Sequence, residues 1–125
     1  MKLRVIDGTF CVCQLEAGKA PPAPQNTGQF YSITTTGEEI SIVCEESQTP
    51  DNCTRIERGY SLIKIDEILD FSLVGILSRI AGILAEQQIS IFALSTYNTD
   101  YILLQKVDLK MAAEALSNAG YQFIK

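Results

Sequence analysis

The hydrophobic and polar positions in the second half of the chain follow two different periods. Apolar side chains recur at spacings of three and four over residues 73–87, which predicts an amphipathic helix, and a similar face follows Asp108. Alternating runs predict strands over 60–65, 89–97, 101–106 and 121–124. The order β-α-β-β-α-β indicates an α+β, ferredoxin-like unit: a four-stranded antiparallel sheet with both helices on one face.

Local signals place the ends of the two helices. Ser72 is the expected N-cap of the first, with Phe71 and Ile76 spaced as a hydrophobic staple. Asp108 is the expected N-cap of the second helix, and Gly120 stands where a helix commonly ends.

The first half shows strand patterns but no helical one. A strand is predicted over 3–15, bent near Gly8, and a hairpin over 30–36 and 39–46. Three prolines at positions 21, 22 and 24 exclude a regular helix between them, and the polar stretch 47–59 is typical of a connector. We therefore expect residues 1–59 to form a degenerate copy of the complete unit at 60–125.

Composition excludes several classes of function. The 125 residues contain no histidine, which removes Ser-His-Asp and Cys-His catalysis and histidine-rich zinc sites. A net charge of −5 disfavours nucleic acid and anionic membranes as partners. No apolar run reaches the roughly 20 residues of a membrane span, and the first residues lack the apolar core of a signal peptide. These features favour a cytoplasmic protein.

Four cysteines leave several interpretations open. Cys11 and Cys13 lie two apart in a predicted strand and so share a face. With Cys44 and Cys53 they could be buried core thiols, a metal or redox pair, or a regulatory disulfide. The Cys-x-x-Cys spacing of structural zinc sites is missing, so core thiols are favoured and no metal is expected.

Two stretches resemble the ACT domain, a small-molecule sensing module of amino-acid metabolism. They are residues 70–77, at the first strand-to-helix junction, and 89–103, across the hairpin. Residues 30–34 and 39–44 look similar to the N-terminal half of small bacterial tandem-ACT proteins and of the eukaryotic cytosolic arginine sensors; aspartate kinase carries related units. The resemblance implies a non-enzymatic regulatory module that binds a small molecule, without a cofactor or a catalytic residue.

The same residues suggest how an amino acid would be held at the junction between the two ACT-like units. A helix start supplies free N–H groups that favour an α-carboxylate, and Gly75 lets a ligand approach the backbone closely. Asp100, or else Asp70, would bind an ammonium or a cationic side chain. The expected ligand-binding residues are Asp70, Leu73, Val74, Gly75, Ile76, Thr96, Tyr97 and Asp100.

Each of these residues has a plainer interpretation. Gly75 could serve only helix packing, Asp70 only the electrostatics of a helix start, and Asp100 only a turn. Thr96 and Tyr97 could be core or rim residues.

At the level of the whole protein, the alternatives are an interaction module with a vestigial pocket and a small enzyme using Asp or Cys chemistry. We expect a homodimer or higher oligomer. The alternative is a monomer in which the two units already cover each other's exposed sheet edges.

Overall fold

A computed structural model describes residues 1–20 and 27–124. The chain divides into two compact units: residues 1–6 with 61–125, called here the C-terminal unit, and residues 7–60, called the N-terminal unit. This division differs from the expected one because the first six residues lie with the C-terminal unit. The expected proline-rich interruption falls largely at residues 21–26, outside the described residues.

Two long strands run through both units. They are β1 (Lys2–Glu16) and β4 (Arg55–Ile65). Each contains a glycine with positive φ beside the boundary between the units, Gly8 at 118° and Gly59 at 84°. Glycine adopts such angles without the steric strain that a Cβ would cause. The bend expected near Gly8 is therefore matched by this conformation.

The C-terminal unit has the predicted order of elements. After β4 come α1 (Ile76–Glu86), β5 (Ile91–Ser95), β6 (Asp100–Gln105), the 3₁₀ turn η2 (Lys106–Asp108), α2 (Leu109–Asn118) and β7 (Gln122–Ile124). Its strand order is β7-β1-β4-β6-β5. The sheet thus has a fifth strand that the pattern from residue 60 did not predict, because residues 2–4 of β1 pair in parallel with residues 122–124.

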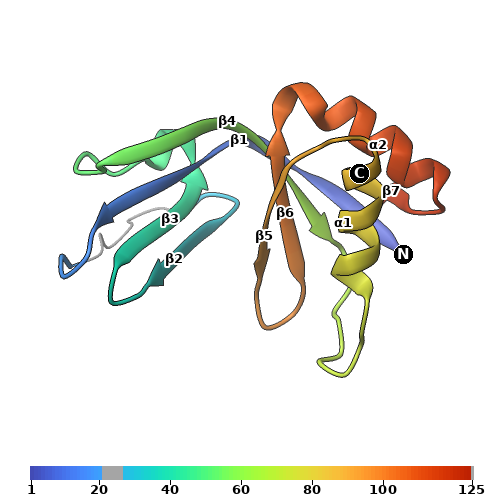
Figure 1. Ribbon diagram of the computed structural model, residues 1–125, viewed down its shortest axis with the longest axis horizontal. Helices are drawn as coiled ribbons and strands as arrows, with labels where there is room; N and C mark the ends of the chain where they lie inside the picture. Colours follow the sequence, from blue (N-terminus) through green and yellow to red (C-terminus); the bar gives the residue numbers. More distant parts are fainter. Residues whose placement is uncertain (21–26, 125) are drawn as a thin grey trace. The chain divides into compact units, whose positions relative to one another are not determined.

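Both helices pack on one face of this sheet, and Figure 1 shows α1 and α2 together on one side of its strands. Apolar residues of β1, β4 and β6 meet the buried faces of the helices. The fully buried members of this core are Leu3, Ile63, Ile65, Ile80, Leu84, Ile102, Leu104, Ala112 and Leu116. The burial of this apolar face is the main force that holds the helices on the sheet.

The start of α1 differs from the prediction. The helix begins at Ile76, and Gly75 holds the N-cap position in a left-handed conformation without a side-chain cap. Ser72 is instead bound to Asp70, whose carboxylate accepts hydrogen bonds from the backbone N–H and the hydroxyl of Ser72. Phe71 is 78% exposed, so the expected hydrophobic staple is absent as well. The second helix starts and ends as predicted, although Asp108 makes no side-chain cap hydrogen bond.

The N-terminal unit is built from strands in its described part. The predicted hairpin is β2 (Tyr31–Thr35) and β3 (Glu39–Glu45), followed by the 3₁₀ turn η1 (Glu46–Gln48). The strand order is β2-β3-β1-β4. The connector expected over 47–59 is shorter than predicted, since β4 already begins at Arg55. The first residues of β4 are polar, so their sequence did not indicate a strand, although β4 pairs with β1.

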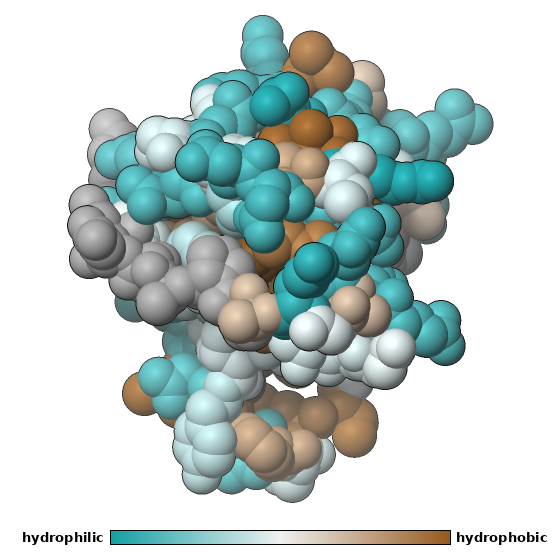
Figure 2. All heavy atoms as spheres, turned by 90° about the vertical axis from the view of Figure 1, so that its left-hand side faces the viewer, coloured by the Kyte–Doolittle hydropathy of each residue, from teal (hydrophilic) through white to brown (hydrophobic). Residues whose placement is uncertain are grey.

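Hydrophilic and weakly polar side chains predominate on the face that Figure 2 shows, and hydrophobic atoms appear there in separate patches at the top, centre and bottom of the view. Among the helices of the described residues, none combines the length and the apolar character that crossing a membrane requires.

Candidate functional site

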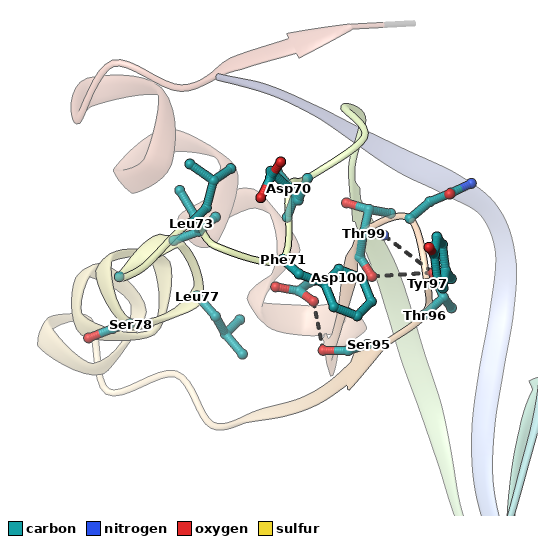
Figure 3. A pocket seen from close by; sticks show the side chains of 14 residues that line it. Asp70, Phe71, Leu73, Leu77, Ser78, Ser95, Thr96, Tyr97, Thr99 and Asp100 are labelled. Carbon is teal, nitrogen blue, oxygen red and sulfur yellow. Dashed lines mark hydrogen bonds between the residues drawn. The ribbon is translucent and has the colours of Figure 1, made fainter.

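A cavity of about 340 Å³ lies within the C-terminal unit, at the low end of the usual range for small-molecule sites. Three segments surround it: the loop after β4, the first turn of α1, and the turn between β5 and β6 (Figure 3). The residues that line it are Leu69, Asp70, Phe71, Leu73, Gly75, Ile76, Leu77, Ser78, Ser95, Thr96, Tyr97, Asn98, Thr99 and Asp100.

The turn between β5 and β6 forms one wall of the cavity and is firmly fixed. The backbone N–H of Thr96 donates to the carbonyl of Thr99 at 2.8 Å. The Thr99 side chain is buried, and its hydroxyl donates to the carbonyl of Ile65 on β4 at 2.7 Å. A satisfied buried hydroxyl is costly to remove, so this bond anchors the turn to the central sheet.

Asp100 is held by its partner across the hairpin. Ser95 and Asp100 are opposite each other in the register of β5 and β6, and the Ser95 hydroxyl donates to Oδ1 of Asp100 at 2.6 Å. The dashed line in Figure 3 marks this bond. In the described part of the chain the other carboxylate oxygen accepts no hydrogen bond, and it is therefore available to a ligand.

The loop after β4 forms the opposite wall. The backbone N–H of Leu69 donates to the carbonyl of Asn98 at 2.7 Å, which ties this loop to the β5–β6 turn. Oδ1 of Asp70 accepts from the N–H of Ser72 at 2.8 Å and from its hydroxyl at 2.6 Å. These hydrogen bonds, first that from the hydroxyl, hold the pKa of Asp70 below its usual value. The carboxylate thus carries its charge and fixes the loop.

The first turn of α1 closes the third side of the cavity. The carbonyl of Gly75 accepts the first bond of the helix, from the N–H of Arg79 at 3.0 Å. The N–H groups of Gly75 through Ser78 therefore have no partner within the helix, and Gly75 carries no side-chain cap. A Cβ added at Gly75 would meet no atom within 4 Å, so only its φ of 76° requires glycine.

Charge and apolar surface are unevenly distributed around the cavity. Of the described residues that line it, two are charged, and both are carboxylates, Asp70 and Asp100. Apolar surface comes from leucines and from an aromatic pair, in which the rings of Phe71 and Tyr97 lie 5.1 Å apart. Both rings are largely exposed, at 78% and 84%. The cavity therefore offers free N–H donors and acidic groups beside apolar walls.

The structure gathers all the residues predicted for the site except Val74, which is 89% exposed and does not line the cavity. The cavity is lined by residues of the C-terminal unit. Asp100 bonds a facing side chain and not its own turn, while the carboxylate of Asp70 accepts its two hydrogen bonds from Ser72 in the loop.

Sequence reasoning missed half of the lining residues: Leu69, Phe71, Leu77, Ser78, Ser95, Asn98 and Thr99. The tight hairpin turn was the available signal, because it places Ser95 opposite Asp100. The bonds of Asn98 to Leu69 and of Thr99 to Ile65 link segments about thirty residues apart, and no local pattern predicts them.

A family model described as an ACT domain matches residues 55–118, which is half of the chain. The chain belongs to the ACT domain family. A second family model, of an N-terminal domain, matches residues 8–52. The recognition from residues 70–77 and 89–103 is therefore confirmed.

Individual proteins are also similar to this ACT domain chain. The crystal structure of protein Atu0741 from Agrobacterium tumefaciens is 34% identical, covers 98% of this chain and 91% of its own, and superposes with a TM-score of 0.88. The human protein CASTOR3P is 26% identical over an alignment of 102 residues that covers 72% of this chain; the chain spans 63% of that relative.

Aspartokinase III from Escherichia coli shares the fold at 14% identity and a TM-score of 0.60, over 93% of this chain and 32% of its own; that structure was solved with aspartate and ADP.

Proposed function

We propose that this ACT domain protein is a non-enzymatic regulatory module that binds a free amino acid in the cavity of the C-terminal unit. One observation carries the proposal: the unpaired N–H groups at the start of α1 and the free oxygen of Asp100 line the same cavity. An amino acid carries an anionic and a cationic group close together. A site with anion-binding N–H groups and a carboxylate offers partners for both.

The ligand's α-carboxylate would lie on the N–H groups from Gly75 to Ser78, where the helix dipole adds to the hydrogen bonds. Its ammonium group, or a cationic side chain, would meet Asp100. The apolar part would pack on Leu73, Leu77 and the exposed ring of Phe71. Because the lining charges are both negative, this arrangement favours a neutral or cationic amino acid over an acidic one.

Membership of the ACT domain family supports the regulatory part of the proposal. A regulator needs a site that binds a metabolite reversibly and no reacting side chain at it. The described lining residues contain no cysteine, lysine or histidine that could act as an activated nucleophile or base.

We also infer that the protein assembles as a homodimer or higher oligomer. The support is the edge strands of the sheet: among the described strands, β5 ends the strand order in the C-terminal unit and β2 ends it in the N-terminal unit. Unpaired edge strands offer N–H and C=O groups to another chain. Light scattering at micromolar concentration should give about twice the monomer mass of 13.8 kDa or a higher multiple of it; the monomer mass would contradict this inference.

A thermal-shift screen of the twenty amino acids tests the binding proposal. A ligand at one hundred times its dissociation constant adds about 2.7 kcal/mol to the free energy of unfolding, which raises Tm by several degrees. Asp100→Asn should remove this rise. Asp51→Asn is the matched control, because it deletes the same charge at an exposed position of the N-terminal unit and should keep the rise.

The screen also separates the two candidate functions. If no amino acid at millimolar concentration raises Tm, binding is refuted and the interaction module with a vestigial pocket replaces it. If Asp100→Asn lowers the Tm of the unliganded protein by as much as the ligand raises it, Asp100 is a structural residue and the assigned binding mode is wrong.

A further inference from the structure

The cysteines gather in the N-terminal unit, apart from the cavity residues. Cys11 on β1 and Cys44 on β3 are opposite each other in the antiparallel register, and Figure 1 shows these two strands side by side. Their Sγ atoms are 3.8 Å apart, and both side chains are fully buried. Cys13 lies on the same face and is buried as well, whereas Cys53 is half-buried.

Hydrogen bonding distinguishes the two facing thiols. Oγ1 of Thr49 lies 3.4 Å from Sγ of Cys11, but the Thr49 hydroxyl hydrogen is directed to the carbonyl of Glu46 at 2.7 Å. The donor that stabilises a Cys11 thiolate is therefore the S–H of Cys44. This bond lowers the pKa of Cys11 to about 6 and raises that of Cys44. The lowered pKa favours Cys11 as the nucleophile of the pair.

A thin segment covers these thiols. Thr49 and Cys53 pack against the cluster, and both belong to the connector 46–54 between β3 and β4. Its residues are half-buried or exposed. At its far end the N–H and hydroxyl of Thr54 donate to the carbonyl of Gln14. Opening this connector breaks few hydrogen bonds and no pairing between β1 and β3, so a reagent can reach the thiols by local opening.

We propose that Cys11 and Cys44 form a site of reversible covalent modification by small-molecule disulfides of the glutathione class, and that the product is a cross-strand disulfide. Facing residues of an antiparallel pair have Cα atoms about 4.5–5.5 Å apart, within the roughly 4.4–6.8 Å that a disulfide spans. The two sulfur atoms need to approach by less than about 2 Å to reach bonding distance.

The reaction balances in two exchanges. The Cys11 thiolate attacks one sulfur of the small disulfide, forms a mixed disulfide and releases one thiolate. Cys44 loses its proton to solvent or to the released thiolate and attacks Sγ of Cys11, which expels the second small thiol. Two protein thiols are oxidised and one small disulfide is reduced to two thiols. Excess thiol reverses both steps.

The other arrangements of the cysteines fit less well. Among the described residues, no group of three or more His, Cys, Asp or Glu side chains is placed to hold a metal ion. Burial raises the pKa of Cys13 to about 11, so its thiol keeps its proton at neutral pH and reacts slowly. Cys53 is the more accessible thiol, but it has no partner as close as the 3.8 Å between Cys11 and Cys44.

Incubating the full, reduced chain with oxidised glutathione under native conditions tests the proposal. Remaining thiols are then blocked with an alkylating reagent, and intact mass and peptides are measured. Trypsin cannot resolve the pairing, because it leaves Cys11 with Cys13 and Cys44 with Cys53. Cleavage after Glu45 or Glu46 separates the latter two, and Cys13→Ala removes the remaining ambiguity.

We expect the chain to lose two hydrogens, to yield a Cys11–Cys44 cross-linked peptide in the wild type and in Cys13→Ala, and to recover its thiols with reductant. Cys44→Ser, which keeps a hydroxyl donor beside Cys11, should stop at one glutathione on Cys11. Cys44→Ala, which removes that donor, should form the same mixed disulfide more slowly and no cross-link. A bond between Cys13 and Cys53, glutathione on Cys53 alone, or thiols that react only after denaturation would each overturn the proposal.

Discussion

The cavity of the C-terminal unit and the thiol cluster of the N-terminal unit differ in the elements that carry their functional groups and in the exposure of those groups to solvent. The cavity is built from loops and a helix start, and of its two charged groups Asp70 is exposed and Asp100 is half-buried. The thiols lie on the inner face of paired strands, where they are shielded from water. Reversible ligand binding needs open, unpaired groups, whereas selective thiol chemistry needs a fixed partner and limited access.

The largest expected effect is that a core substitution in the C-terminal unit destabilises that unit more than the N-terminal unit. Leu84→Ala removes a fully buried side chain from the core beneath α1 and should lower the free energy of unfolding by about 2–5 kcal/mol. Amide hydrogen exchange should accelerate in residues 61–124 more than in residues 7–60. Ile68→Ala, at an 81% exposed position, should change stability by less than about 0.5 kcal/mol. Equal acceleration in both units would show that they unfold together.

Thr99→Val tests the anchor of the cavity wall. Valine keeps the shape of threonine but leaves the carbonyl of Ile65 without its donor, which should cost about 1–3 kcal/mol in chemical denaturation. Thr34→Val, on the exposed side of β2, is the control and should be nearly neutral. A neutral Thr99→Val would mean that the hairpin turn is held by its backbone bonds alone.

Alkaline pH should weaken the N-terminal unit through Cys13. Its folded pKa of about 11 lies above the unfolded value of about 8.5, so stability is fully retained below about 8.5 and falls as pH rises towards 11. Cys13→Ala should make this decline shallower by up to about 1.4 kcal/mol per pH unit in urea unfolding. Val43→Ala, at a buried position of β3 without a thiol, should lower stability and leave the slope unchanged.

The smallest expected effects on stability concern two glycines, Gly75 at the start of α1 and Gly82 within it, and they are expected to have opposite signs. Gly75→Ala should destabilise the unit by about 1–2 kcal/mol, because alanine is strained at a φ of 76°. Gly82→Ala should stabilise it by about 0.5–1 kcal/mol, since Gly82 lies inside the helix and its Cβ meets no atom within 4 Å. Thermal denaturation measures both, and effects of equal sign would contradict the left-handed N-cap.

The sequence predicted those parts of the fold that depend on local periodicity. The strands and helices of the C-terminal unit follow from alternating and helical patterns, and half of the cavity residues were predicted at the strand-to-helix junction and the hairpin. The helix start was wrong because Asp70 competes for Ser72 and Gly75 adopts a left-handed conformation. The fifth strand, residues 2–4 beside residues 122–124, and the pairing of Cys11 with Cys44 depend on contacts between distant segments, which no local pattern encodes.

Backbone amide chemical shifts, measured by NMR while an amino acid that raises Tm is added, test the central claim most directly. The proposed site predicts the largest changes at residues 69–78 and 95–100, with the N–H groups of Gly75 to Ser78 shifted most and residues 7–60 nearly unchanged. Changes concentrated in residues 7–60, or none at the start of α1, would contradict the assignment of the cavity as the ligand site.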